Sequence, residues 1–170
     1  MGKLIFLGDA IFDIAEKNPE VRKKLLFKEE KKFVEKLKRD RDLRKILRIG
    51  REAFTELNPL DYKDKTSCEV LVALFEVDEE NPPTLTDEFS TSLDKLAEEA
   101  SVTAPTVKKH LKKLHEKGFI ELLELKRKTV RWKFTPKSFC WVEYQREVIC
   151  RFPKTPFFVM EVDDILDKMD

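Results

Sequence analysis

The residues with the clearest chemical capacity in this sequence are lysines and arginines spaced along one segment. Lysines occur in two pairs, Lys108-Lys109 and Lys112-Lys113, so they occupy neighbouring positions on successive turns of a helix. A second basic group, Lys126-Arg127-Lys128, follows after a short apolar stretch. Because ammonium and guanidinium groups bind phosphate oxygens, this arrangement indicates a surface for a phosphate-bearing partner.

The cysteines and histidines do not form a metal site by their spacing. Cys68, Cys140 and Cys150 are widely separated and include no C-x-x-C pair, which argues against a disulfide framework or a zinc ribbon and favours a reducing compartment. His110 and His115 are five residues apart, whereas two helical metal ligands need a spacing of four. We therefore expect no metal and no cofactor.

Catalytic signatures are also missing from the sequence. There is no nucleophile paired with a base and no Gly-x-Gly fingerprint, and the chain of 170 residues contains only 4 glycines, too few for a glycine-rich phosphate loop. We therefore predict that the protein is not an enzyme.

The composition favours a helix-rich globular protein. Hydrophobic residues make up 41% and charged residues 39% of the chain, so it can bury a core. The apolar stretch Leu4 to Phe12 is too short to span a bilayer and is interrupted by Asp9, so we expect a cytoplasmic protein without a membrane contact. Heavy use of Lys, Arg and Glu beside a single glutamine resembles proteins of thermophiles.

The lysine pairs need a helix to position them, and the apolar spacing predicts one over residues 103–117. Val107, Leu111 and Leu114 recur at helical intervals and would form its buried stripe. Thr103 is a helix-capping residue, and Gly118 is suited to end the helix. The paired lysines would then project away from the core.

Further elements are predicted on both sides of this helix. Apolar residues predict helices over about 67–75 and 93–100, with a loop and one short strand over 84–90 between them. After Gly118 the alternation predicts two strands, 119–125 and 130–135, with Val130, Trp132 and Phe134 on one face. The basic tip lies between these two strands.

The remaining segments predict flanking helices. These are 18–26, one or two long amphipathic helices over 28–57, a helix over 138–150 and a last acidic helix beyond Pro156. The fold class is thus mainly α with a small β-hairpin (α+β). We expect three regions: a basic helical extension over 1–60, a central domain over 61–137 and a C-terminal helical extension over 138–170.

The charge is strongly uneven along the chain, although its net value is only +1. Residues 17–52 carry 15 basic and 7 acidic side chains, and residues 101–137 carry 11 basic and 3 acidic ones. Residues 61–100 carry 3 basic and 12 acidic side chains. A neutral total therefore conceals basic blocks suited to an anionic partner.

The segment from Leu93 to Ile120 resembles the winged helix-turn-helix superfamily of prokaryotic regulators, particularly its ArsR and MarR-like branches. The matching points are Leu-x-x-Leu-Ala at its start, Thr-Val in the third helix, His-Leu-x-x-Leu and the Gly-Phe-Ile entry to the hairpin. The resemblance covers roughly 67–135, and the long acidic, Pro-rich connection 78–92 departs from the compact pattern. It implies binding of double-stranded DNA by a recognition helix (103–117) and a basic wing (126–131).

Helix-turn-helix docking assigns the site residues. The start of a recognition helix reaches base edges, whereas later residues and the wing contact the DNA backbone. The base-proximal residues are then Pro105, Thr106, Lys108 and Lys109. The residues contacting the backbone or belonging to the wing are Thr103, Lys112, Lys113, Lys126, Arg127, Lys128 and Arg131.

We therefore predict a transcriptional regulator that binds double-stranded DNA as a homodimer. We expect the basic N-terminal helices to form the dimer, and the alternative is that they are a second surface that contacts DNA. A plasmid or viral replication-initiation or partition protein is an alternative that uses the same fold. A winged helix that binds only proteins is a third possibility. The sequence does not identify an effector, an operator or the sign of regulation.

Overall fold

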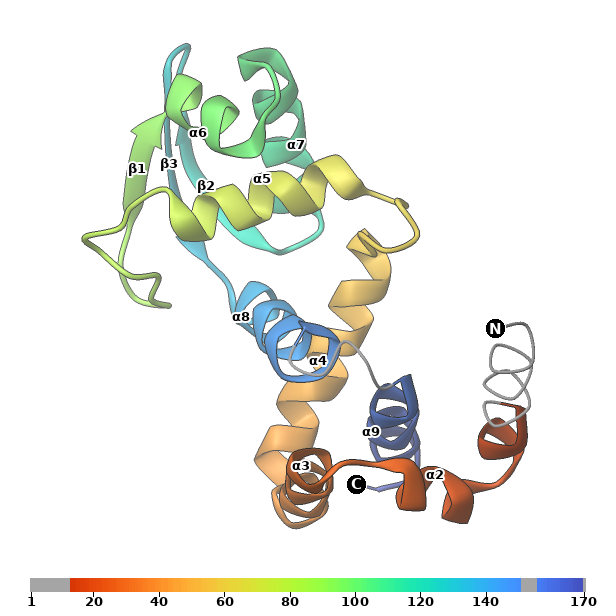
Figure 1. Ribbon diagram of the computed structural model, residues 1–170. Coiled ribbons are helices and arrows are strands. Elements are labelled where there is room, and N and C mark those ends of the chain that lie inside the picture. The colour runs from red at the N-terminus through yellow and green to blue at the C-terminus, as the bar shows by residue number, and fades with distance from the viewer. Residues whose placement is uncertain (1–12, 151–155, 170) are drawn as a thin grey trace. The chain divides into compact units, whose positions relative to one another are not determined.

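The computed structural model describes residues 13–150 and 156–169 (Figure 1). These residues fall into two compact units. The central unit is Ile49–Val142, and the terminal unit combines the residues up to Arg48 with those from Glu143 onward. The apolar stretch from Leu4 to Phe12 lies outside the described residues.

The central unit contains a three-stranded sheet packed with three helices, together with parts of the two helices that flank this region in the chain (Figure 1). The strands are ordered β1-β3-β2, and both pairings are antiparallel. This confirms the α+β fold class and the predicted order of elements. In chain order these are α5 (Lys65–Glu76), β1 (Phe89–Ser92), α6 (Leu93–Ala100), α7 (Ala104–Glu116), β2 (Ile120–Leu125) and β3 (Thr129–Phe134).

The first strand joins the predicted hairpin and completes the sheet. Phe89 pairs with Trp132 and Thr91 pairs with Val130 in the register of β1 and β3. Phe89 and Trp132 are both buried, whereas Ser90 is exposed, so β1 shows the alternation of a strand with one face on the core. The strand begins near the end of the segment 84–90 and extends two residues past it.

Burial of one face fixes the rotation of helix α7 about its own axis. Val107, Leu111 and Leu114 have no solvent exposure, so the predicted stripe is the buried face. Thr103 caps the helix by accepting a hydrogen bond from the backbone N–H of Thr106. Gly118 has a φ of 82°, in the left-handed region where glycine is favoured, and it directs the chain from α7 into β2. These features confirm the prediction for residues 103–117.

An acidic residue holds α7 against α5. Asp64 caps α5 through a hydrogen bond from the Ser67 backbone N–H, and its carboxylate lies 2.7 Å from Lys113 Nζ and 3.4 Å from Lys117 Nζ. Burial by itself would raise the pKa of this carboxyl, but hydrogen bonds from Lys113 and Ser67 outweigh burial and lower the pKa to about 2. The charged form of Asp64 therefore stabilises the packing of α5 on α7.

His110 belongs to the same cluster. Its Nδ1 lies 2.8 Å from Ser67 Oγ and 4.0 Å from an Asp64 carboxylate oxygen. Burial, together with the positive charges of Lys113 and Lys109, lowers the pKa of His110 despite the nearby carboxylate. His110 is therefore a packed histidine at the α5–α7 contact.

The terminal unit is built around α9 (Pro156–Lys168), on which α2 (Pro19–Leu25) and α3 (Lys28–Arg39) pack. The rings of Phe33 and Phe158 meet edge to face with centroids 5.4 Å apart. Arg22 is buried, and its guanidinium pairs with Glu161 at 2.9 Å and with Asp164. Aromatic packing and a buried ion network thus help to attach the N-terminal helices to α9.

One flanking element agrees with its prediction of one or two helices, and another differs from its prediction. The segment 28–57 forms two helices, α3 and α4 (Arg41–Leu57), because Asp40 interrupts it and accepts a hydrogen bond from the backbone N–H of Leu43. The expected single helix over 138–150 is α8 (Pro136–Tyr144) followed by a π-helical segment, η1 (Gln145–Cys150). Apolar spacing does not distinguish α-helical from π-helical hydrogen bonding over a single turn.

Replacing Asp64 by Asn tests the cluster. Asn caps a helix as well as Asp does, so Asp64→Asn removes the charge and keeps the cap. We expect a loss of roughly 1–2 kcal/mol in the free energy of unfolding at pH 7. Because folding lowers the pKa of Asp64, the difference from wild type should be full above about pH 4 and disappear as the pH falls towards 2. Urea unfolding measures both effects, and Asp94→Asn at an exposed position is the control.

Replacing Gly118 by Ala tests the helix end. No atom lies within 4 Å of the added methyl group, so the only cost is the left-handed backbone. We expect a destabilisation of about 1 kcal/mol by thermal or urea unfolding. Ser101 has a φ of 56°, and Ser101→Gly is the matched control, expected to be neutral or stabilising. Equal effects of the two variants would contradict this account of Gly118.

Candidate nucleic-acid interface

The start of α7 presents a polar surface to solvent. Pro105 and Lys109 are exposed, and Thr106 and Lys108 are half-buried, on the side away from the buried stripe. The hydroxyl groups of Thr103 and Thr106 are 2.8 Å apart, so the two threonines restrain each other at the N-terminus of the helix. The four residues predicted to approach bases therefore share one end of α7.

Three lysines on α7 keep their charges available. Lys108, Lys109 and Lys112 form no ion pair with any residue that the structure describes. Lys112 is exposed one turn beyond Lys108, so the unpaired cations continue along the helix. An ammonium group without an internal partner loses no ion pair when it binds a phosphate.

Lys113 differs from these three lysines. Its ammonium pairs with Asp64, and 42% of its side chain is exposed. The assignment of Lys113 to the DNA backbone stays a prediction, and within the fold the residue has a structural role. Sequence reasoning missed this role because Asp64 is 49 residues away in the chain and its capping of α5 was not foreseen.

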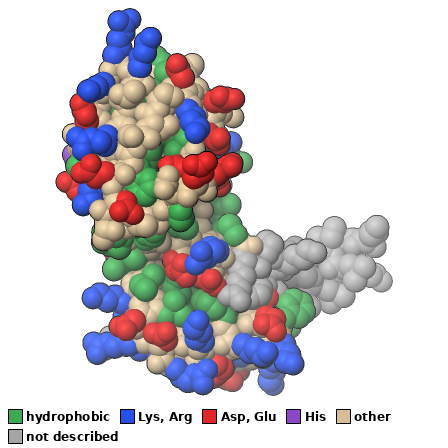
Figure 2. Space-filling view, turned by 90° about the vertical axis from the view of Figure 1, so that its left-hand side faces the viewer, with side chains coloured by type: hydrophobic (Ala, Val, Ile, Leu, Met, Phe, Trp, Pro, Cys, Tyr) green, Lys and Arg blue, Asp and Glu red, His purple; other side chains and the backbone are tan. Residues whose placement is uncertain are grey.

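The wing, residues 126–131, contains both paired and unpaired cations. Lys126 Nζ lies 3.1 Å from Glu124 Oε1, and Arg131 Nη1 lies 2.7 Å from Glu88 Oε2. A hydrogen bond from Lys126 is the main reason that the pKa of Glu124 is lowered. Arg127 and Lys128 are exposed and form no ion pair within the described part of the chain. Lys and Arg side chains project at the top of the view in Figure 2.

One comparison with known proteins gives a match to this region. Residues 85–121 match the model of a family described as winged helix-turn-helix DNA-binding. The matched segment includes β1, α6 and α7 and ends at the start of β2. The chain contains a winged helix-turn-helix. No curated protein and no solved structure matches the chain.

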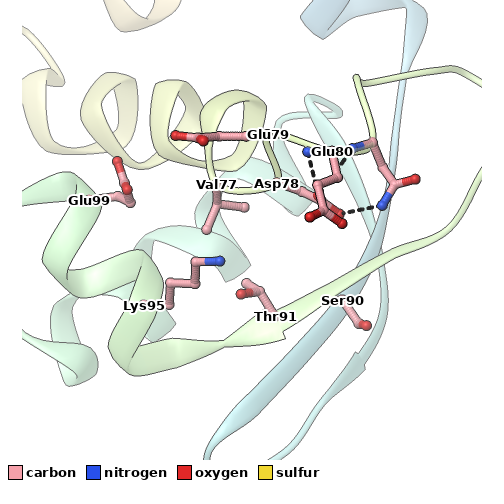
Figure 3. A pocket seen from close by; sticks show the side chains of 9 residues that line it. Val77, Asp78, Glu79, Glu80, Ser90, Thr91, Lys95 and Glu99 are labelled. Atoms are coloured by element: carbon pink, nitrogen blue, oxygen red, sulfur yellow. Dashed lines mark hydrogen bonds between the residues drawn. The ribbon is translucent and has the colours of Figure 1, made fainter.

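The winged helix-turn-helix has an acidic side as well as a basic one. A hollow of about 580 Å³ lies between the end of α5, β1 and α6, and Asp78, Glu79, Glu80 and Glu99 line it around Lys95 (Figure 3). Hydrogen bonds from Asn81 lower the pKa of Asp78 and keep it ionised. Carboxylates repel phosphate, so this side is unsuited to nucleic acid.

The arrangement of Ser67, His110 and Asp64 is not that of a catalytic triad. Both Ser67 Oγ and the Asp64 carboxylate approach the same ring nitrogen, Nδ1, whereas a triad uses the two nitrogens separately. Ser67 also has no solvent exposure. The cluster therefore acts in packing within the winged helix-turn-helix.

Among residues 13–150 and 156–169, no group of three or more His, Cys, Asp or Glu side chains could hold a metal ion. None of the helices described there is long and apolar enough to cross a membrane. Cys68, Cys140 and Cys150 form no disulfide with one another.

Neutralising the wing tip tests its part in binding. The double variant Arg127→Gln, Lys128→Gln should weaken binding to all duplexes similarly, because phosphate contacts carry no sequence information. The slope of log K against log salt should decrease by about 2, since each phosphate contact contributes about one unit. Fluorescence anisotropy at several salt concentrations measures this slope. The control variant Lys63→Gln, Lys65→Gln makes the same charge change on the α5 side. An equal salt slope for the two double variants would contradict the assignment of Arg127 and Lys128 to phosphate contacts.

Proposed function

We propose that this protein binds double-stranded DNA with α7 in the major groove and the β2–β3 wing on the adjacent backbone, and that it is a transcriptional regulator. The observation that carries the proposal is the fixed orientation of α7. One face of this helix is fully buried, and the other carries a polar N-terminus and unpaired lysines. The match of residues 85–121 to a winged helix-turn-helix DNA-binding family supports the same conclusion.

The residues at the start of α7 are suited to reading bases. Lys108 and Lys109 can donate hydrogen bonds to the O6 and N7 atoms of guanine. The Thr106 hydroxyl is already held by Thr103, which leaves its methyl group for apolar contact with a thymine methyl. Pro105 is exposed at the second position of the helix, where its missing N–H is not needed by the helical hydrogen bonds.

Cations further from the helix start hold the duplex by its backbone. Lys112 follows Lys108 by one turn, and Arg127 and Lys128 project from the wing tip. Contacts of this kind set the register and orientation of the protein on DNA. They also make binding dependent on salt, because each bound phosphate releases condensed counterions.

A homodimer in the cytoplasm is part of the proposal. Winged-helix regulators bind pseudo-palindromic sites as two-fold dimers. Ile46 and Ile49 lie one turn apart on α4, and their exposed fractions of 39% and 38% support contact with a second copy. The three cysteines form no disulfide with one another, which is consistent with a reducing compartment.

Selection of bound duplexes from a random pool is the test. We expect enrichment of one sequence, arranged as two inverted half-sites if the protein binds as a dimer. In a gel shift on the selected duplex, Lys108→Glu, Lys109→Glu should abolish binding without changing the circular dichroism spectrum, because both side chains lie outside the core. The matched control Lys63→Glu, Lys65→Glu should bind as wild type does.

The outcomes separate the proposal from its rivals. Failure of the wild-type protein to bind any duplex would reject DNA binding and favour a winged helix that binds only proteins. Binding without sequence preference would contradict a regulator. Genomic footprinting then distinguishes promoters from the origins or partition sites expected of a replication or partition protein.

A further inference from the structure

The outer face of α3 in the terminal unit is a second cationic surface. It consists of Lys28, Lys31, Lys32, Glu35 and Arg39, which together line a shallow hollow of about 440 Å³. All five side chains are exposed. In Figure 2, Lys and Arg side chains project along the lower edge of the view. We call this set the α3 face.

Most of the positive charge on the α3 face has no partner in the part of the chain that the structure describes. Lys28, Lys31 and Arg39 form no ion pair with any described residue. Lys32 Nζ lies 3.6 Å from Glu29 Oε1. Both side chains are more than 60% exposed, so this ion pair is weak. Glu35 is the acidic member of the face and lies 3.7 Å from Lys38. Four cations and one carboxylate leave a net charge of +3.

The opposite side of α3 is already occupied within the terminal unit. Phe33, Val34 and Leu37 are buried, and Phe33 packs on Phe158 of α9. An amphipathic helix that binds a membrane inserts its apolar side into the lipid, and α3 has no apolar side left for this. The outer face must therefore act through charge alone.

The length of the α3 face favours an extended polyanion. Lys28 and Arg39 are separated by eleven residues, which corresponds to roughly 16 Å along a helix axis. The cations are spread over three turns instead of converging on one point, so they do not form a cradle for a single small anion. Duplex DNA carries about one negative charge per 1.7 Å of its axis and matches a row of cations of this length.

We propose that the α3 face binds the phosphate backbone of the same duplex that the winged helix-turn-helix binds, outside the segment read by α7. This inference rests on the proposed function. Once α7 and the wing are bound, the terminal unit is held near the duplex, and its high effective concentration makes additional weak phosphate contacts favourable. Contacts of this kind add affinity and salt dependence without changing the preferred sequence.

The test is the triple variant Lys28→Gln, Lys31→Gln, Arg39→Gln, which neutralises the three unpaired cations. Fluorescence anisotropy with a duplex of about 40 base pairs, roughly four helical turns, gives the salt slope. We expect the slope to decrease by about 2 to 3, since three phosphate contacts are lost. The ratio of affinities for the selected and a scrambled duplex should not change.

The matched control is Lys63→Gln, Lys65→Gln, Lys168→Gln, which removes the same charge at exposed positions outside the α3 face. Circular dichroism melting should show that both triple variants fold as wild type does, because none of the six side chains is buried. The control should keep the wild-type slope. Equal slopes for the two triple variants would overturn the inference.

Two further outcomes identify where a failure lies. If wild type binds the duplex and the α3 variant retains the full slope, the α3 inference fails while the proposed function stands. If wild type does not bind, the proposed function fails as well. If light scattering shows that the α3 variant changes the oligomeric state of the protein, the face binds a second copy, and this result also overturns the inference.

Discussion

The rotation of α7 about its axis is the constraint on which the rest of the central unit depends. Val107, Leu111 and Leu114 have no solvent exposure, and turning the helix would expose them. The Asp64 carboxylate holds the same orientation from the polar side by pairing with Lys113 and Lys117. With one face determined in this way, the position of every other α7 side chain follows from helical geometry, and Lys108, Lys109 and Lys112 remain outside.

Paired and unpaired cations have different roles in this protein. Lys113 and Arg131 form ion pairs and join elements that are distant in sequence. Arg22 does the same in the terminal unit through Glu161 and Asp164. Lysines such as Lys112 have no such partner among the described residues and are available to an external anion. The distinction explains how a chain with a net charge of +1 can present cationic faces, because many of its carboxylates are used internally or gather in the acidic hollow.

Much of the fold could be predicted because its signals are local. The cap at Thr103, the stripe of α7 and the turn at Gly118 are short-range features, and the structure confirms each of them. The β2–β3 hairpin was equally clear from alternation. The pairing of β1 with β3 was not foreseen, since it joins residues about 40 positions apart and depends on closing the acidic connection. The π-helical segment η1 also gave no signal, because its apolar residues are compatible with an α-helix.

The sequence by itself determined the elements of this protein, the type of its central fold and the basic segments that favour a DNA partner. Periodicity and capping depend on neighbouring residues, so they can be read without a structure. Tertiary structure decided which of the predicted cations are free. Lys113 meets Asp64, and Lys126 and Arg131 meet Glu124, whereas Arg127 and Lys128 have no partner within the described residues. An ion pair requires two side chains to approach within a few ångströms, and only the folded chain determines which residues do so.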